Sequence, residues 1–158
     1  TVDQIMSREE MWGLIDAADS VISLHRSEGF GLVPAEAMLL GKPVVATDWS
    51  ATSEFLDDLN GLPVPYELVP VEDPVQYRGF SDQRWAEPDL DAAADGLARL
   101  RQSPLMRAQI GARAQSVAAQ AFSRDLYEAR MRELLDAPDS APVTRPLLPA
   151  PADGAMRA

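Results

Sequence analysis

The sequence predicts an α/β fold, in which helices cover a parallel sheet, followed by a helical C-terminal part. Residues 8–65 alternate helical and strand patterns with short connections, and this alternation is typical of a parallel sheet between helices. Residues 89–136 have helical patterns throughout. A chain of 158 residues is long enough for one domain with a sizeable core.

The elements of the first half follow from local signals. A capping box of the form Ser-Arg-Glu-Glu precedes a helix expected at 8–17. A short β-branched run at 21–24 predicts a strand buried on both faces. Pro34 suits the first turn of the next helix, and Gly41 is placed to cap its end. The remaining expected elements are a strand at 43–46, a loop at 48–52, a short helix at 53–56 and a weak strand at 62–65.

The second half begins with an interruption. Residues 66–88 are rich in proline and aromatic side chains, so we expect a functional connection or a packed Ω-loop. After it, Asp89 or Asp91 caps a helix that runs to about residue 101. Ser103 and the proline after it open a second helix, which continues or kinks into a third near 123–125.

Composition excludes several function classes. The chain has no cysteine and one histidine, which excludes a disulfide framework, a thiol nucleophile and a multi-histidine or thiolate metal site. With 14 basic and 25 acidic residues, the net charge is -11, so we expect no nucleic-acid partner. No apolar run approaches the roughly 20 residues that span a bilayer.

Both ends of the chain carry expectations of their own. The first residue is Thr1, not Met, and we expect a fragment of a longer protein. Five prolines lie among Ala, Ser and Asp after residue 136, a composition that predicts disorder. The expected organisation is therefore a domain at 1–136, incomplete at its N-terminus, and a disordered Pro/Ala-rich tail at 137–158.

The informative segment runs from Ser27 to Met38, between a strand and a helix. Glycines at this position let the backbone approach a ligand closely, and a helix start offers free N–H groups for a phosphate. In an open parallel sheet, such a loop lies at the edge where ligands bind. A Gly-x-Gly alone is weak support, and Pro34 stands where the third glycine of a dinucleotide fingerprint would be.

Two carboxylates flank this loop. Glu28 precedes the glycines, and Glu36 lies eight positions later in the helix. Ionised carboxylates only accept hydrogen bonds, so they suit sugar hydroxyls better than phosphate. A nucleotide-sugar offers hydroxyls and a pyrophosphate together. The alternatives are that Glu28 is an ordinary loop carboxylate and that Glu36 is an acid favoured by the helix dipole.

The segment resembles the Glu-x7-Glu motif of retaining glycosyltransferases with the GT-B fold, family 4 in particular. Further runs agree in order and spacing over about residues 3–66: Ala18-Asp19, Ser27-Glu28-Gly29-Phe30-Gly31-Leu32, Glu36-Ala37-Met38, the run from Gly41 to Thr47, and Asn60-Gly61-Leu62 with Val64-Pro65. The resemblance implies a Rossmann-like donor-binding domain, the C-terminal half of a GT-B enzyme. It also implies a nucleotide-diphospho-sugar as substrate, no separate cofactor and no metal.

The resemblance also implies roles for single residues. Glu36 would hold the ribose hydroxyls, and Glu28 would contact the transferred sugar as the catalytic residue. The backbone from Gly29 through Phe30 and Gly31 to Leu32 would meet the sugar and phosphates. Two neighbours are additional candidates. His25 is either a ligand contact or a satisfied structural histidine, and Arg26 either neutralises phosphate or is an exposed surface arginine.

Parts that the family requires are expected outside this chain. These are the N-terminal acceptor domain, the first strands of the donor domain and the Arg and Lys that bind pyrophosphate. We therefore expect a hexosyltransferase of polysaccharide biosynthesis that is inactive as this fragment, with a glycan or lipid-linked acceptor. Its expected location is cytoplasmic, with peripheral contact to the inner membrane face through the missing half.

Two other functions stay open beside this one. The first is a nucleotide-sugar-binding fragment without activity of its own. The second is an epimerase or phosphorylase relative with the GT-B fold. A phosphorylase needs a lysine that binds pyridoxal phosphate, and nothing singles out Lys42 as one.

Overall fold

A three-stranded parallel sheet lies at the centre of the protein. The computed structural model describes residues 3–71 and 82–136. The strands are β1 (Val21–Ser23), β2 (Val44–Thr47) and β3 (Leu62–Val64), in the order β1-β2-β3. Val21 pairs with Val44, and Val45 pairs with Leu62, both in parallel register. This sheet with its covering helices confirms the predicted α/β class.

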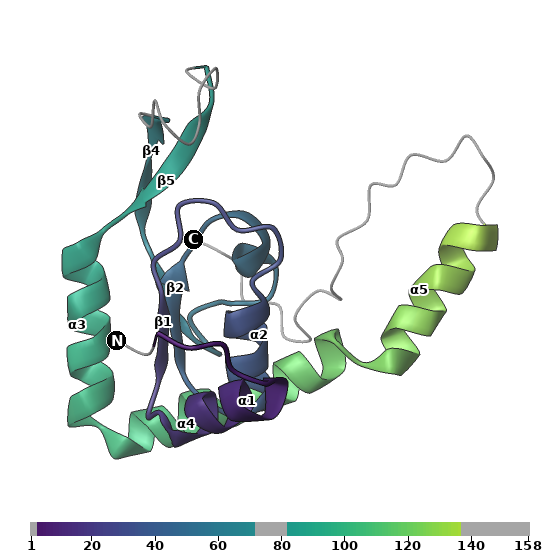
Figure 1. The fold of residues 1–158 in the computed structure, drawn as a ribbon, viewed down its shortest axis with the longest axis horizontal. Coiled ribbons are helices and arrows are strands. Elements are labelled where there is room, and N and C mark those ends of the chain that lie inside the picture. The colour runs from purple at the N-terminus through teal and green to yellow at the C-terminus, as the bar shows by residue number, and fades with distance from the viewer. Residues whose placement is uncertain (1–2, 72–81, 137–158) are drawn as a thin grey trace.

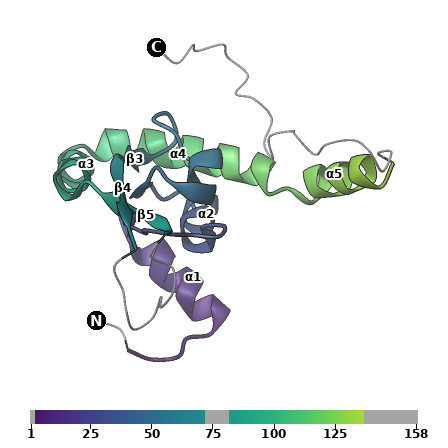
Figure 2. The same cartoon turned by 90° about the horizontal axis from the view of Figure 1, so that it is seen from above.

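Five α-helices accompany the sheet in the described residues. They are α1 (Arg8–Ala17), α2 (Leu32–Leu39), α3 (Leu90–Gln102), α4 (Pro104–Ala121) and α5 (Arg124–Asp136). Figure 1 shows α2 and α3 on opposite sides of the sheet. Figure 2 shows α4 along the length of the molecule, with α5 continuing away from the sheet.

The helices form two hydrophobic cores, one on each face of the sheet. In the fully buried strand β2, Val44 and Ala46 belong to the core under α1 and α2. Val45 belongs to the other core, under α3. This alternation follows from the period of two along a strand. Helix α4 joins both cores, because Ile110 lies in one and Ala114 in the other.

The capping box predicted before α1 is present, and the helix has its predicted bounds. The Ser7 hydroxyl accepts from the Glu10 backbone N–H at 3.2 Å, and the Ser7 N–H donates to Glu10 Oε2 at 2.8 Å. Two backbone donors at the helix start are therefore satisfied by two side chains.

Helix α2 ends in the way that Gly41 predicts. Gly41 has a φ of +70°, which favours glycine. Its N–H donates to the Met38 carbonyl at 2.9 Å, and the Lys42 N–H donates to the Ala37 carbonyl at 2.9 Å. This pair of bonds is a Schellman motif, and it stops the helix.

A close backbone contact joins the end of α2 to α4. A Cβ added to Gly111 would overlap the carbonyl oxygen of Gly41. Next to it, the Gln115 side-chain amide donates to the Leu39 carbonyl at 3.1 Å. The absence of a side chain at Gly111 is thus what allows α4 to pack directly on this turn.

The prediction that strand 21–24 is buried on both faces is wrong. Strand β1 ends at Ser23, lies at an edge of the sheet, and leaves Ile22 45% exposed. The helix that covers this face, α3, packs on β2 and β3. Ile22 is therefore only about half covered by the described residues.

The short helix predicted at 53–56 lies earlier in the chain, as a 3-10 helix at Ser50–Glu54, labelled η1. Ser50, with a φ of +64°, turns the chain into it. The buried Thr52 hydroxyl is within 3.0 Å of both the Thr47 and Trp49 carbonyls. These side-chain bonds form the turn, so the predicted loop at 48–52 is only partly a loop.

Residues 66–88 are not an Ω-loop where the structure describes them. Strands β4 (Tyr66–Pro70) and β5 (Arg84–Pro88) form an antiparallel hairpin, in which Tyr66 pairs with Pro88. Figure 1 shows this hairpin projecting beyond one end of the parallel sheet. Pro70 and Pro88 stand at strand ends, where proline is tolerated, so they did not prevent pairing.

Two of the three C-terminal helices begin at residues predicted to cap them. The Asp89 carboxylate accepts from the Ala92 N–H at 2.9 Å, which decides between the two aspartates considered. Ser103 caps α4 and is followed by proline, while the Ser123 hydroxyl accepts from the Leu126 N–H at 3.2 Å as α5 begins. Of the two alternatives, a continued second helix or a third helix near 123–125, the structure shows the third helix.

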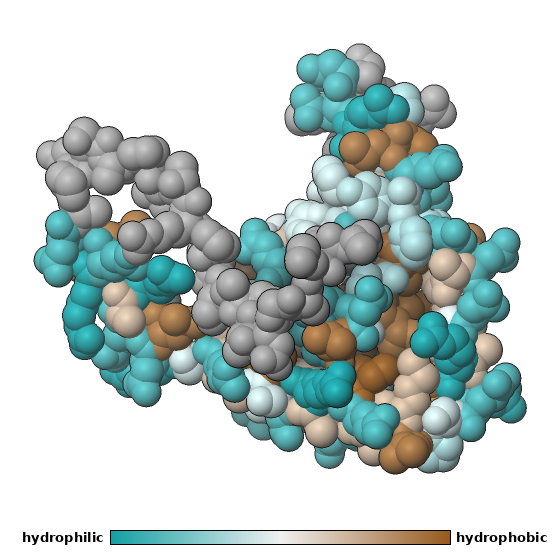
Figure 3. Space-filling model, turned by 180° about the vertical axis from the view of Figure 1, so that it is seen from behind, coloured by the Kyte–Doolittle hydropathy of each residue, from teal (hydrophilic) through white to brown (hydrophobic). Residues whose placement is uncertain are grey.

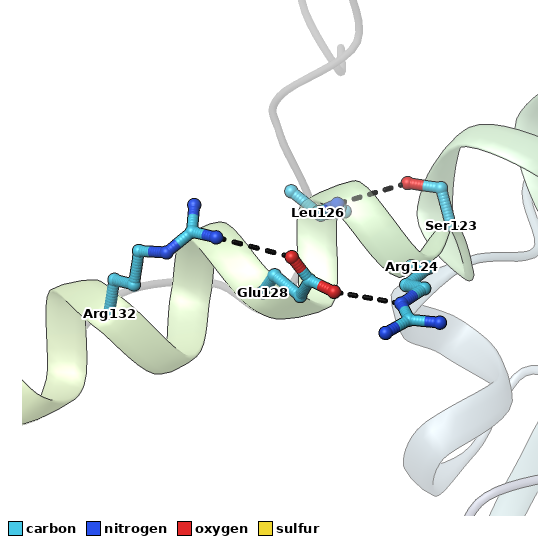
Figure 4. Close-up of polar contacts among 5 residues, drawn as sticks. All are labelled: Ser123, Arg124, Leu126, Glu128 and Arg132. Atoms are coloured by element: carbon cyan, nitrogen blue, oxygen red, sulfur yellow. Dashed lines mark hydrogen bonds and ion pairs between the residues drawn. The ribbon is translucent and has the colours of Figure 1, made fainter.

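Helix α5 has no buried residue. Its apolar side chains are partly or largely exposed, with Leu135 77% and Leu134 50% exposed, and Figure 3 shows brown residues among teal ones on this projecting helix. Its polar face carries a chain of ion pairs: Glu128 binds Arg124 at 2.7 Å and Arg132 at 3.2 Å (Figure 4). Such pairs support an exposed helix. The tail predicted at 137–158 lies outside the described residues.

Candidate functional site

The segment predicted to bind a ligand lies between the end of β1 and the start of α2, and we call residues 25–31 the site loop. The loop turns into α2 at Gly31, which has a φ of +84°. A Cβ on Gly31 would lie 2.8 Å from Thr52 Cγ2 and 3.3 Å from Phe55 Cζ. Both the backbone conformation and the space thus require glycine. The helix begins two residues before the predicted Pro34.

The Glu28 carboxylate lies against the backbone of its own loop. The Phe30 N–H donates to Glu28 Oε1 at 3.2 Å. Hydrogen bonds from the Gly31 and Phe30 N–H groups hold the pKa of Glu28 below its ordinary 4.5, with a smaller electrostatic contribution from His25. Glu28 is therefore an anion that can only accept hydrogen bonds. The Ser50 hydroxyl holds its backbone by donating to the Glu28 carbonyl at 2.6 Å.

Glu36 lies in the second turn of α2 and meets α1. Arg8 Nη2 lies 3.4 Å from Glu36 Oε1, and the Arg8 guanidinium lies 5.4 Å from the centre of the Trp12 ring. The Arg8 side chain is 75% exposed and that of Glu36 is 19% exposed, so the ion pair is weak. The carboxylate is thus fixed by its helix and can exchange its partner for a ligand. Sequence patterns gave no signal for Arg8, which is 28 positions away.

The remaining residues predicted to bind the donor differ in exposure. Around Gly29, a Cβ would meet no atom within 4 Å, so a ligand has open access to this backbone. Leu32 is 63% and Phe30 48% exposed. The centre of the Phe30 ring lies 5.6 Å from that of Phe122, at the end of α4, and 6.4 Å from that of Phe55, at the end of η1.

A cavity of about 640 Å³ adjoins the site loop. Gly29 and Phe30 form its wall on the loop side, and the end of α4 and the start of α5 form the other. Its size is that of a small-molecule pocket. The sequence analysis did not predict it, because its lining comes from three separate segments of the chain: Gly29, Phe30, Ala51, Glu54, Phe55, Ala121, Phe122, Ser123, Arg124, Leu126, Tyr127 and Arg130.

His25 has partners on both ring nitrogens. Nε2 lies 3.1 Å from the Trp49 carbonyl and 3.2 Å from the Thr52 hydroxyl, and Nδ1 lies 3.3 Å from the Ser23 hydroxyl. Because a carbonyl can only accept, the neutral ring carries its proton on Nε2. His25 thus links the end of β1 to η1, which agrees with the structural reading of this residue.

Arg26 points to the β4–β5 hairpin. Its Nη2 lies 2.6 Å from Glu87 Oε2, and its guanidinium lies 4.9 Å from the centre of the Trp85 ring. Arg26 is thus bound to the hairpin. The two carboxylates lie elsewhere, Glu28 in the site loop and Glu36 in α2. Sequence reasoning missed Trp85 and Glu87 because their strand was not predicted.

Two further findings concern the described residues 3–71 and 82–136. Their histidine, aspartate and glutamate side chains form no group of three or more that could hold a metal ion. None of their helices is both long enough and apolar enough to cross a membrane.

Comparisons with known proteins bear on the family of this segment. Residues 2–78 match the family model described as "Glycosyl transferases group 1". This segment is similar to glycosyltransferases of group 1. It contains β1, the site loop, α2, β2 and β3, and therefore every residue predicted to bind the donor.

A relative supports the same assignment. The chain is 43% identical over 88 residues to the lipopolysaccharide core biosynthesis mannosyltransferase LpsB of Rhizobium meliloti (strain 1021). The alignment covers 52% of this chain and 24% of that protein. The chain therefore spans about a quarter of the length of this glycosyltransferase relative.

Proposed function

We propose that this chain is the donor-binding part of a retaining glycosyltransferase of the family 4 type. Its substrate is a nucleotide-diphospho-sugar, and the sugar goes to a glycan or lipid-linked acceptor. The observation that carries the proposal is the site loop, where the Glu28 carboxylate and the N–H groups at the start of α2 lie together within the segment that matches glycosyltransferases of group 1. We place acceptor binding outside this chain and expect no transfer by the 158 residues alone.

The proposed roles follow from the geometry of the loop and α2. The diphosphate lies at the start of α2, where N–H groups and the helix dipole stabilise its charge. Glu36, on the rigid helix, accepts hydrogen bonds from the ribose hydroxyls in place of Arg8. The open backbone at Gly29 is where the sugar approaches.

Glu28 changes its partners in this proposal. In the structure its carboxylate accepts the hydrogen bond of the Phe30 N–H, which is one of the groups that we assign to binding of the nucleotide-sugar. A phosphate at this N–H replaces the carboxylate, because both are anionic acceptors. Glu28 is then free to accept from a hydroxyl of the transferred sugar.

The reaction that we propose needs no general base from the chain. The bond between C1 of the sugar and the phosphate oxygen breaks, and a bond from C1 to the acceptor oxygen forms on the same face. The acceptor hydroxyl gives its proton to the leaving phosphate oxygen. Charge that develops on the leaving diphosphate is stabilised by the N–H groups of α2.

The test is a transfer assay on the full-length gene product with a panel of nucleotide-sugars. NMR of the product should show that the anomeric configuration is kept. Inversion would contradict the retaining mechanism. Transfer by the 158-residue chain alone would contradict our placement of the acceptor site.

The second candidate function is nucleotide-sugar binding without turnover. It is favoured by the hydrogen bond from the Phe30 N–H to Glu28, since a carboxylate held by its own loop can serve that loop alone. Calorimetric titration separates the two functions. Binding of a sugar nucleotide by the full-length protein, without transfer to any glycan or lipid-linked acceptor, would support this second candidate.

A further inference from the structure

The base of the β4–β5 hairpin holds one residue of the site loop by three contacts. The Ala86 N–H donates to the Arg26 carbonyl at 3.0 Å. The Arg26 side chain pairs with Glu87 at 2.6 Å and lies over the Trp85 ring at 4.9 Å. Three consecutive residues of β5 thus fix both the backbone and the side chain of Arg26, two positions before Glu28.

The other strand of the hairpin reaches the same loop by a second route. The ring of Tyr66, the first residue of β4, lies 5.1 Å from the ring of Trp49. The Trp49 carbonyl accepts from His25. The next residue, Ser50, donates to the Glu28 carbonyl. Contacts from β4 and from β5 therefore converge on the backbone that carries Glu28.

The loop needs such external supports. Glu28 lies outside any helix or strand, and Gly29, the residue after it, has open space around its Cα. Glycine restrains the backbone less than any other residue. The backbone from which the Glu28 side chain extends is therefore held from outside the loop, by β5 at Arg26 and by Ser50 at the Glu28 carbonyl.

We propose that Arg26 is a positioning residue, through which the β4–β5 hairpin orients Glu28 toward the transferred sugar. The proposal rests on the proposed function, because it takes Glu28 as the residue that contacts the sugar. A group that acts on a substrate must be held within a fraction of an ångström, and supporting contacts supply that precision.

The variants for the test are Arg26→Gln, Glu87→Gln and the double variant in the full-length protein. Two variants of the same hairpin serve as matched controls. Arg84→Gln removes a guanidinium whose contact, to the Leu68 carbonyl at 2.8 Å, lies within the hairpin. Glu67→Gln removes the negative charge of Glu67, the residue that lies opposite Glu87 in the hairpin. Glu67 itself takes part in no ion pair among the described residues.

The first measurement is hydrogen exchange of the backbone amides at 26–31, which requires no activity. Arg26→Gln should raise exchange about three- to tenfold, the range that an exposed ion pair and a cation–π contact together support. Glu87→Gln should give a smaller rise, because the Trp85 contact stays. The double variant should show the same exchange as Arg26→Gln, because the two substitutions remove the same ion pair between Arg26 and Glu87. Exchange equal to that of Arg84→Gln would overturn the proposal.

The second measurement separates positioning from general damage. Arg26→Gln should lower kcat/KM for the sugar donor about three- to tenfold and leave the affinity for nucleoside diphosphate within about twofold. Arg26→Lys, which keeps the charge, should recover part of the loss. Faster exchange with unchanged kcat/KM would overturn the positioning role. If the wild-type protein neither binds nor transfers a sugar, the proposed function fails, and the role of Arg26 toward the sugar fails with it. The hydrogen-exchange comparison still shows whether the contacts of Arg26 with β5 hold the site loop.

Discussion

The carboxylate of Glu28 accepts a hydrogen bond from the backbone N–H of Phe30, two positions later, at 3.2 Å. The loop is thereby closed on its own acid. Glu36, in contrast, forms an ion pair with the exposed side chain of Arg8 at 3.4 Å. The two acids of the Glu-x7-Glu pair thus stand in different environments, and their substitution should have different consequences.

Glu36→Ala should weaken both nucleoside diphosphate and nucleotide-sugar. A hydrogen bond to a charged acceptor contributes roughly 1.5–3 kcal/mol, which corresponds to a ten- to hundredfold loss of affinity. Glu28→Gln should leave diphosphate affinity within about threefold, because the N–H groups of the loop stay available, and should lower kcat/KM for the donor. Calorimetry and steady-state kinetics on the full-length protein measure both. Equal losses of diphosphate affinity in the two variants would contradict separate roles.

The lowered pKa of Glu28 predicts a pH dependence of stability. Because the folded pKa lies below the ordinary 4.5, the contribution of Glu28 is fully present above pH 4.5 and is lost as the pH falls through the lowered value. The difference in unfolding free energy between wild type and Glu28→Gln should therefore shrink as the pH falls from 5 toward about 3. Urea titrations at several pH values measure it. The exposed Glu67→Gln serves as control, and a difference that grows toward low pH would reverse the sign of the shift.

Two glycine-to-alanine substitutions should change stability in opposite directions. Gly111→Ala places a methyl group on the Gly41 carbonyl and should cost about 1–3 kcal/mol, because backbone must shift. Gly13→Ala, inside α1, meets no atom within 4 Å and should stabilise by up to about 1 kcal/mol through helix propensity. Urea unfolding of the two variants checks both signs. A neutral Gly111→Ala would mean that α4 does not pack on the turn at Gly41 as described.

Two buried threonines provide a second matched pair. Thr52 is fully buried and its hydroxyl is within 3.0 Å of two carbonyls, so Thr52→Val should cost about 1–3 kcal/mol by leaving these groups unpaired. The Thr47 hydroxyl is buried and finds no partner among the described residues. Thr47→Val should therefore be neutral or stabilise by up to about 1 kcal/mol. Thermal unfolding ranks the two, and a larger loss for Thr47→Val would contradict the bonding pattern.

The elements that could be predicted from the sequence are those with local signals. The bounds of α1 were predicted from its capping box, and the C-terminal helices from Asp89 and from Ser103 with the proline after it. A cap acts within one turn of its own helix, so a few adjacent residues suffice to locate it. The loop before α2, the helix itself and its end at Gly41 could be predicted for the same reason, because their signals also lie in adjacent residues.

What could not be predicted depends on partners distant in the chain. Pairing in the hairpin joins Tyr66 to Pro88. Because prolines stand at the ends of both strands, the sequence pattern did not indicate strands there. The exposure of Ile22 depends on which helix covers which strand. In the site, the sequence indicated Glu28 and Glu36 through their spacing. It did not indicate that Arg8 and Arg26 engage distant residues, because only the tertiary fold brings these groups together.

The passage of α4 from one face of the sheet to the other bears on how the protein unfolds. Ile110 packs with Val45 and Leu100 in one core, and Ala114, one turn later, packs in the other. Neither core can lose this helix without exposing part of its neighbour. The two cores should thus melt in a single cooperative transition, which also removes the support of the site loop.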